Sequence, residues 1–381
     1  MRQLLVNGRV FDGEAIRDGL AVVLEGAEVA ALVPQGEAPD AGRRHDLEGG
    51  LLAPGFLDVQ VNGGGGVLFN ESPSVEGIRT IGRAHRRFGT TGFLATLLSD
   101  AWEVMEAAGR AVEAALAERL PGLRGVHFEG PYLNRERKGI HEEAALRAVD
   151  SGAIELFTSP RLGRVVVTLA PETVAPDFVR ALADAGVRVC IGHSAADYDQ
   201  ARRGLDAGAS GFTHLFNAMT QLNSRAPGVI GAALEDPDSW CGIIVDGHHV
   251  HDTTLKVAIA AKAHGRMMLV TDTMPSVGAE DKRFELQGQT IVVEDGRCAN
   301  AEGRLAGSDL DMATAVRNAV RRLGLPLEEA LRMASLYPAA FLGLEQRLGR
   351  IAPGFDADLV LLDQELEVRD TWIGGRAAEE D

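Results

Sequence analysis

The middle of the chain alternates short apolar, β-branched runs with amphipathic segments. Eight runs are typical of buried strands, and they cover residues 51–62, 91–99, 123–130, 165–172, 187–194, 209–218, 240–247 and 267–273. Helical patterns separate most of them, for example at 75–89, 101–120, 176–186 and 253–265. Strands and helices that alternate in this way are typical of a (β/α)8 barrel or of a doubly wound parallel sheet.

The two ends of the chain have a different texture. Residues 1–51 read as short strands broken by Gly and Asp turns, and residues 345–381 return to that pattern. Neither end contains enough residues for a core of its own. We therefore expect one small β domain, a β-sandwich built from 1–51 plus 345–381, beside a barrel that spans 52–344.

Composition and charge restrict the class of protein. With 381 residues, 45% of them hydrophobic, the chain can bury a large core. A net charge of −17 argues against nucleic acid or an anionic membrane as partner, because both need a basic face, but it does not exclude a small anionic substrate. The three cysteines indicate no disulfide framework, and we find no signal-type segment or membrane span. We expect a soluble protein of the reducing cytoplasm.

Polar side chains at the ends of the predicted strands favour the barrel. Barrel active sites collect residues from the carboxyl ends of many strands, whereas a doubly wound sheet uses fewer, near its switch point. The polar residues at these ends are Gln60, Asn62, Glu129, His193, His214, Asn217, Asp246 and Asp272.

Three of these residues suggest a metal site. Glu129, His193 and His214 end separate predicted strands, and carboxylate oxygen with imidazole nitrogen is a ligand set suited to a catalytic divalent ion. A single histidine at such a position is more often a hydrogen-bonded interior residue, but three at matching positions favour the metal. Asp272 could exchange a proton with a reacting water, or it could simply cap the turn that follows.

Other polar residues allow more than one interpretation. The run of glycines at 63–66 lacks the spacing of a nucleotide-binding loop and predicts a mobile or tightly turned loop. His141 could reach a substrate from a loop, and His127 could pack beside the metal. His248, His249 and His251 crowd one loop, where they could bind a metal or contact substrate or a neighbouring subunit. Arg225 is either an anion-binding group or an ordinary surface arginine. The surface histidines are predicted to be His45, His85 and His264.

Several motifs together, in this order, resemble the N-acetylglucosamine-6-phosphate deacetylases of the amidohydrolase superfamily. They are PGFLDVQVNGGGG, GTTGFLATLLS, HFEGPYLN, KGIHEEA, GHSAADY, THLFNAM, DGHHV, LVTDTM, LAGS and the tail GRIAPGFDADLVLLD. HFEGP, GHS and THLFNAM are the specific ones, whereas the tail indicates only the superfamily. TDTM replaces a more Ala-rich stretch, which leaves the finer substrate contacts open.

The resemblance implies a role for each matching position. Glu129, His193 and His214 would hold the divalent ion, and Asp272 would be the general acid and base. A homodimer is implied, which could assemble further into a tetramer, with Arg225 and His249 binding the substrate phosphate across the interface. The residues implied to bind the phosphorylated, N-acetylated sugar are Gln60, Asn62, Ile140, His141, Asn217, Ala218, Arg225, Asp246, His249, Leu305, Ala306 and Gly307.

The end of the first barrel strand bears on the number of ions. Many superfamily members carry His-x-His there, whereas this chain has Gln60-Val61-Asn62. Amides are poor ligands beside imidazole, so we expect one ion per subunit, Zn²⁺ by preference over Fe²⁺, Mn²⁺ or Co²⁺. Gln60 and Asn62 would then hydrogen-bond to water or substrate.

Three rival functions stay open at this point. N-Acetylgalactosamine 6-phosphate differs from the expected substrate by the configuration of one hydroxyl. A cyclic amidase would need His-x-His and a strand-end lysine, which the sequence lacks. A non-catalytic scaffold would be expected to have lost metal ligands or the last-strand aspartate, and this chain has them all.

Overall fold

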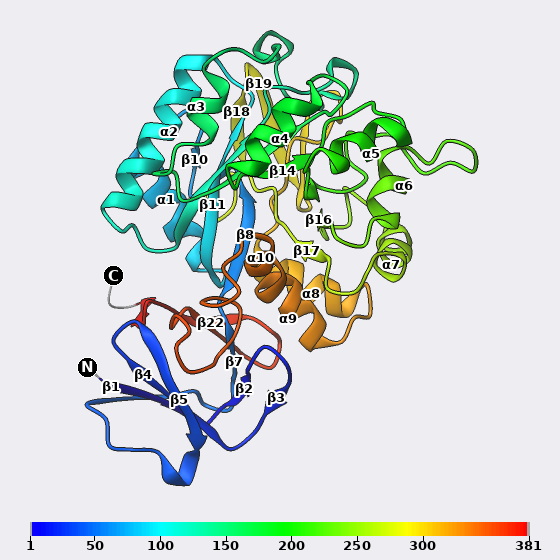
Figure 1. Ribbon diagram of the computed structural model, residues 1–381. Helices are drawn as coiled ribbons and strands as arrows, with labels where there is room; N and C mark the ends of the chain where they lie inside the picture. The colour runs from blue at the N-terminus through cyan, green and yellow to red at the C-terminus, as the bar shows by residue number, and fades with distance from the viewer. Residues whose placement is uncertain (1, 379–381) are drawn as a thin grey trace.

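A computed structural model describes residues 2–378 and shows a parallel barrel with helices around it (Figure 1). The predictions of eight central strands and of a (β/α)8 barrel are confirmed. The strands follow one another in chain order around the sheet: β8 (Phe56–Val61), β11 (Thr90–Leu98), β12 (Leu123–Glu129), β13 (Arg164–Leu169), β14 (Arg188–Ile191), β15 (Gly211–Phe212), β16 (Trp240–Ile243) and β17 (Met267–Leu269).

The segment after β17 closes the barrel at its mouth. Thr273 forms a parallel bridge with Val61. The Asp272 amide donates to the Gln60 carbonyl at 3.0 Å, and the Asn62 amide donates to the Thr273 carbonyl at 3.0 Å. These bonds hold the end of the last strand against the end of the first.

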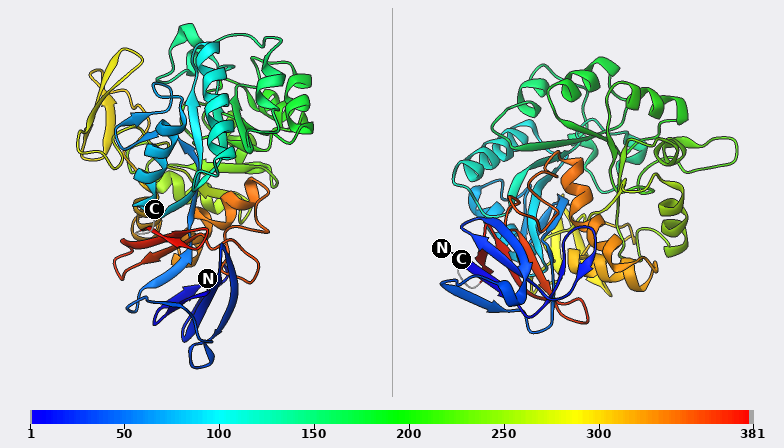
Figure 2. Two further views of the ribbon diagram at one scale, coloured as in Figure 1. Left: turned by 90° about the vertical axis from the view of Figure 1, so that its left-hand side faces the viewer. Right: turned by 60° about the horizontal axis from the view of Figure 1, so that its bottom comes forward.

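Helices cover the outside of the strands, as the view in the right panel of Figure 2 shows. In α1 the Ser74 side chain caps the helix by accepting from the Gly77 amide, and Ile78 and Ile81 form the buried face. The helices are α1 (Val75–Arg86), α2 (Trp102–Ala117), α3 (Ala153–Phe157), α4 (Pro176–Asp184), α5 (Tyr198–Asp206), α6 (Gly228–Glu235), α7 (Asp252–Ala261), α8 (Met312–Arg321), α9 (Leu327–Ala334) and α10 (Leu336–Phe341), with short 3₁₀ turns η1 (Gln35–Glu37), η2 (Arg135–Arg137) and η3 (Glu143–Ala145).

Strands from both chain ends lie together at the end of the barrel where β8 begins (Figure 1). One sheet has the order β5 (Glu28–Pro34), β4 (Leu20–Glu25), β1 (Arg2–Val6) and β6 (Arg43–Asp46). The other has the order β23 (Arg376–Ala377), β22 (Val368–Ile373), β21 (Leu359–Leu362), β7 (Leu51–Pro54), β2 (Arg9–Phe11) and β3 (Ile16–Arg17). The domain boundaries drawn from the sequence stay a prediction.

The first predicted strand, 51–62, is in fact two strands in different sheets. β7 pairs with β21, whereas β8 belongs to the barrel. Gly55 separates them, and a Cβ at that position would lie 1.9 Å from the Thr91 hydroxyl oxygen. The apolar run is continuous because both strands are buried, so periodicity could not reveal the break.

Two small sheets were not predicted. β9 (Gly63–Gly64) pairs with β10 (Val67–Leu68), so the glycine run forms a tight turn in which Gly65 and Gly66 have φ of 63° and 84°. The sheet of β18 (Arg283–Leu286), β19 (Gln289–Glu294) and β20 (Arg297–Asn300) stands beside the barrel mouth, in yellow in the left panel of Figure 2. Its strands are half-exposed, which explains their weak apolar signal.

An ion pair joins β12 of the barrel to the residue just before β21 of the terminal sheet. Arg124 pairs with Asp358, whose side chain is 5% exposed and also accepts from the Gly374 amide at 2.7 Å. Burial raises the pKa of Asp358, and the guanidinium of Arg124 opposes that rise. The pair therefore links the two parts of the molecule only while both partners are present.

We predict that Arg124→Met lowers the free energy of unfolding by roughly 3 kcal/mol, because it leaves a buried carboxylate without its cation. Arg124→Met with Asp358→Asn should recover part of that loss. The control is Arg2→Met, which breaks a pair with Glu25 whose side chains are 45% and 52% exposed, and should cost less than about 1 kcal/mol. Equal losses in urea unfolding for the two single variants would contradict this role.

Candidate metal centre and substrate pocket

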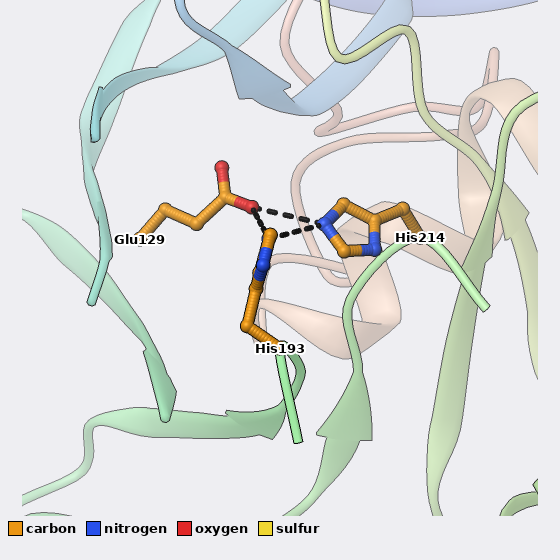
Figure 3. Close-up of side chains that lie close together, drawn as sticks. All are labelled: Glu129, His193 and His214. Carbon is orange, nitrogen blue, oxygen red and sulfur yellow. Dashed lines mark hydrogen bonds and ion pairs between the residues drawn. The ribbon is translucent and has the colours of Figure 1, made fainter. Parts of the chain in front are cut away.

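Three strand-end side chains meet at the barrel mouth. Nε2 of His193 and Nε2 of His214 each lie 3.0 Å from Oε1 of Glu129, and 3.0 Å from each other (Figure 3). All three side chains are buried, and they form a group that could hold a metal ion. The structure therefore brings together the three residues that the sequence singled out as ligands.

Hydrogen bonding indicates which imidazole nitrogen of His193 faces the cluster. Its Nδ1 lies 2.8 Å from the Arg137 carbonyl, which can only accept, so Nδ1 bears a proton. Nε2 is then the nitrogen that points at Glu129 and is available to a metal ion. This is the arrangement that fixes the orientation and tautomer of histidines in metal sites.

The buried carboxyl of Glu129 is kept in its charged form by its histidine neighbours. Burial raises its pKa, but hydrogen bonds with His193 and His214 outweigh burial and bring the pKa well below the usual range. The pKa of His214 is raised: burial lowers it, and the hydrogen bond with Glu129 more than compensates. The cluster thus favours a negative carboxylate with positive charge beside it, which is the balance that a divalent cation would satisfy.

Asp272 lies next to this cluster and is held by two amide side chains. Its Oδ1 accepts from Nδ2 of Asn62 at 2.7 Å and from Nε2 of Gln60 at 3.0 Å, and Gln60 also donates to Oε2 of Glu129 at 3.2 Å. Burial, followed by the nearby charge of Glu129, raises the pKa of Asp272 to about 6. A carboxyl that titrates near neutrality can both accept and return a proton.

That Gln60 and Asn62 contact water or substrate stays a prediction. Both side chains are buried, and neither lines the pocket. Their amide donors are directed at carboxylates, so they position Asp272 and Glu129. The contact between these amides and the carboxylates depends on the closure of the barrel, which brings the end of β8 beside the segment after β17. The local sequence does not show this closure.

Left-handed backbone turns aim several of these side chains. His193, His214 and Asp272 have φ of 48°, 30° and 53°. Such conformations cost non-glycine residues energy and recur at functional sites. Each one lies two or three residues beyond the end of its strand, in the turn that leaves the barrel, and its side chain lines the cavity at the mouth.

His141 approaches the cluster from the loop between η2 and η3. Its Nδ1 accepts from the Ser99 amide at 3.2 Å, and its Nε2 lies 3.9 Å from Oε1 of Glu129. Because a backbone amide can only donate, Nδ1 is unprotonated and Nε2 bears the hydrogen. Burial, followed by the charge of His193, lowers the pKa of His141 to about 3, so the ring is a neutral donor.

These side chains line one cavity of about 250 Å³. It contains many of the residues expected to bind substrate, together with four lining residues that the sequence did not suggest: Leu98, Gly139, Met274 and Arg304. The expected lining residues are Glu129, Ile140, His141, His193, His214, Asn217, Ala218, His249, Asp272, Leu305 and Gly307.

Three expected substrate contacts lie elsewhere. Ala306 is fully buried, and only its neighbours Leu305 and Gly307 line the cavity. Asp246 lies behind His249, accepting from its Nδ1 at 2.6 Å, so it positions that ring and does not line the cavity. Arg225 is exposed on the loop before α6, which projects from the barrel (Figure 1).

That His249 serves a partner subunit stays a prediction. His249 lines the cavity of its own chain, where its charge affects the pKa of Asp272. The adjacent His248 turns away and contacts the Asp295 carbonyl at 3.1 Å, and His251 caps α7 through the Thr253 amide. That Arg225 binds the substrate phosphate in the cavity of a partner subunit also stays a prediction.

Buried polar residues behind the cavity escaped the sequence analysis. Asp58 accepts from the Gln60 amide at 3.1 Å and from the Thr271 hydroxyl, and burial raises its pKa to about 7. His85, predicted to lie at the surface, is fully buried and contacts the Gly63 carbonyl at 2.8 Å. His127 bonds to the Val59 carbonyl and the Thr168 hydroxyl, which makes it a structural residue. The helical pattern around His85 gave no indication of its long-range partner.

Comparison with known protein families shows which family has this architecture. A model described as the amidohydrolase family matches residues 51–378, and one described as the NagA composite domain matches residues 4–52. The chain belongs to the amidohydrolase family. Among the described residues of this amidohydrolase, no helix is long and apolar enough to cross a membrane.

Named relatives of this amidohydrolase act on two epimeric sugars. It is 44% identical to an N-acetylgalactosamine-6-phosphate deacetylase of Shewanella sp. (strain ANA-3), over 86% of this chain and 83% of that one. It is 34% identical to an N-acetylglucosamine-6-phosphate deacetylase of Haemophilus influenzae, over 99% of both chains. The resemblance to N-acetylglucosamine-6-phosphate deacetylases inferred from the motifs is confirmed.

Solved structures extend the comparison to the whole fold. The N-acetylglucosamine-6-phosphate deacetylase of Pasteurella multocida superposes with a TM-score of 0.96 at 34% identity, covering 99% of both chains. A mutant of the Mycobacterium smegmatis enzyme in complex with N-acetyl-D-glucosamine-6-phosphate superposes with a TM-score of 0.91 at 31% identity, again covering 99% of both chains. The amidohydrolase barrel and the sheets from both chain ends are thus shared with these proteins.

We predict that the purified protein holds one divalent ion per chain, and that His193→Ala and Glu129→Gln each lower the bound metal at least tenfold, since each removes one of three ligands. The matched control is His264→Ala, because the side chain of His264 is 82% exposed and outside the cavity. Metal analysis by mass spectrometry after dialysis measures the effect. Full occupancy in both ligand variants would place the ion elsewhere.

Proposed function

We propose that this chain hydrolyses the acetamide of N-acetylglucosamine 6-phosphate to glucosamine 6-phosphate and acetate. The observation that carries the proposal is that the metal-ligand group, Asp272 and His249 share one small cavity in an amidohydrolase whose relatives carry this activity. The substrate class is inferred from these relatives, whereas the reaction chemistry is inferred from the geometry of the site residues.

The residues present fit one divalent ion. Two imidazole nitrogens and a carboxylate oxygen converge within 4.8 Å, which is the donor set of catalytic zinc, and the amides at Gln60 and Asn62 are occupied with carboxylates. A bound Zn²⁺ would lower the pKa of a reacting water and polarise the acetyl carbonyl; Fe²⁺, Mn²⁺ and Co²⁺ could supply the same chemistry.

Asp272 performs the proton transfers. Its carboxylate accepts a proton from the attacking water and later delivers it to the departing amine, so one group works first as base and then as acid. Gln60 and Asn62 both donate to Oδ1, which leaves Oδ2 free of those bonds and available for the proton. The anchored carboxylate therefore needs no reorientation between the two steps.

His141 stabilises the charge that develops on the acetyl oxygen. The Ser99 amide fixes its tautomer so that Nε2–H faces the cavity. Because its pKa is about 3, the ring stays neutral and does not repel a neighbouring cation. A donor fixed before the reaction stabilises an oxyanion with little reorganisation.

A homodimer would give Arg225 a role in this reaction. The arginine is exposed on a projecting loop whose Leu222 is 55% exposed, and a large apolar side chain at such a place suits a protein contact. Arg225 would reach the cavity of the partner from there and add to the binding of the phosphate.

We predict that the wild-type protein releases acetate from N-acetylglucosamine 6-phosphate, and that Asp272→Asn lowers kcat by about 10²–10⁴, since it removes the proton carrier while retaining the shape. Asp281→Asn, at an exposed position outside the cavity, should leave kcat unchanged and serves as the control. Equal rates for wild type and Asp272→Asn would refute the proton-transfer role.

The second candidate substrate is N-acetylgalactosamine 6-phosphate, favoured by the 44% identity to the Shewanella deacetylase. The same assay decides between the two sugars. A higher kcat/KM for the galacto epimer would transfer the proposal to that substrate without changing the chemistry, and turnover of neither sugar would overturn both candidates.

The pH dependence follows from the state of Asp272. Its pKa of about 6 means that the carboxylate is present above that pH and is lost as pH falls through it, and a bound cation would move the loss to lower pH. The acidic limb of kcat should therefore lie at or below pH 6. Asn62→Ala removes a donor to the charged form, so the limb should shift upward, whereas the exposed control Asn223→Ala should not move it. An unchanged limb in Asn62→Ala would assign it to another group.

A further inference from the structure

Two basic side chains of the chain itself line the cavity, apart from the histidines around Glu129. One is His249, and the other is Arg304. Arg225, the arginine expected to bind phosphate, lines a different cavity of about 580 Å³ between α5 and its own loop. Within one subunit, the guanidinium that reaches the substrate cavity is therefore that of Arg304.

The backbone around Arg304 is firmly held. The Asn300 side chain accepts from the amides of Glu302 and Arg304 at 3.1 and 2.9 Å, and the Asn300 amide donates to the Arg304 carbonyl at 3.0 Å. These bonds close a tight turn at the end of β20. The turn presents Arg304 immediately before Leu305 and Gly307, which line the cavity.

The side chain of Arg304, in contrast, is little used. It is exposed, and its one hydrogen bond within residues 2–378 is a long one, from Nη1 to the Gly139 carbonyl at 3.4 Å. It forms no ion pair with any described residue, although the chain has a net charge of −17. Arg322, for comparison, pairs with Asp252 at 3.0 Å. Most of the five N–H donors of Arg304 are free to bind an anion at the mouth of the cavity.

We propose that Arg304 is a specificity-determining residue that binds the 6-phosphate of the substrate from within the same chain. The inference deepens the proposed function and rests on it. Arg304 approaches from the turn after β20, and His249, oriented by Asp246, approaches from the loop after β16. A dianionic phosphate between the two gains charge-assisted hydrogen bonds, and guanidinium is well suited to that geometry. A substrate without phosphate gains nothing from Arg304.

A competing role for Arg304 is purely structural. Its bond to the Gly139 carbonyl joins two segments that both line the cavity, and this bond alone could fix the shape of the cavity. Such a role needs a hydrogen-bond donor but no charge. It would also affect phosphorylated and unphosphorylated sugars alike, so the two roles can be separated.

The test compares Arg304→Ala, Arg304→Gln and Arg304→Lys on N-acetylglucosamine 6-phosphate and on N-acetylglucosamine. Arg304→Gln retains a donor for the Gly139 carbonyl, and Arg304→Lys retains the charge. We expect KM for the phosphorylated sugar to rise about tenfold in Ala and Gln and less in Lys, with kcat nearly unchanged, because a charge-assisted bond at an exposed position is lost. Values for the unphosphorylated sugar should not change. Arg283→Ala, an exposed arginine of the same small sheet outside the cavity, is the matched control.

Two results would overturn the inference: an equal loss on both sugars that Arg304→Gln restores, or no change in any variant. Calorimetric binding of the product, glucosamine 6-phosphate, provides a readout without turnover, and Arg304→Ala should weaken it about tenfold. If the wild type released no acetate but bound this product through Arg304, the proposed function would fail and the phosphate site would stand. If the wild type did not bind the product, the phosphate site would fail too.

Discussion

The site depends on the close approach of three potential ligand atoms that are buried away from solvent. Nε2 of His193, Nε2 of His214 and Oε1 of Glu129 lie 3.0 Å apart, and all three side chains are buried. Three ligand atoms at that distance are stable only where protons or another positive charge lie between them. The barrel maintains the arrangement because each residue is attached to a different strand end. Protons satisfy it in part, as the raised pKa of His214 indicates, and a divalent cation satisfies it better.

The surrounding residues can be understood from that cluster. A negative Glu129 raises the pKa of its neighbour Asp272, and the amides of Gln60 and Asn62 stabilise the two carboxylates without adding charge. Histidines in place of these amides would add lone pairs and could bind a second ion. In this chain the amides instead donate hydrogen bonds to Glu129 and Asp272, and so hold both carboxylates in place.

Much of this arrangement was predictable from the sequence, and what escaped it has a common cause. Glu129, His193, His214 and Asp272 were predictable because each follows an apolar run whose end is defined locally by turn residues. The roles of Gln60, Asp246 and His249 were not, since they depend on which side chain a neighbouring strand presents. Arg304 also escaped, because it follows a half-exposed small sheet whose strands have little apolar pattern.

The closure of the barrel mouth gives the site a particular place in the order of folding. Gln60 and Asp272 are 212 positions apart in the chain, yet a backbone bond and a side-chain bond join them directly. Contacts between such distant positions form late, because the intervening chain must first be ordered. During synthesis the metal ligands can assemble from β12, β14 and β15 before the chain reaches Asp272. On the proposed roles, an emerging polypeptide would have its metal-ligand group in place before Asp272 joins it, and proton transfer would begin only when the ring of strands is complete.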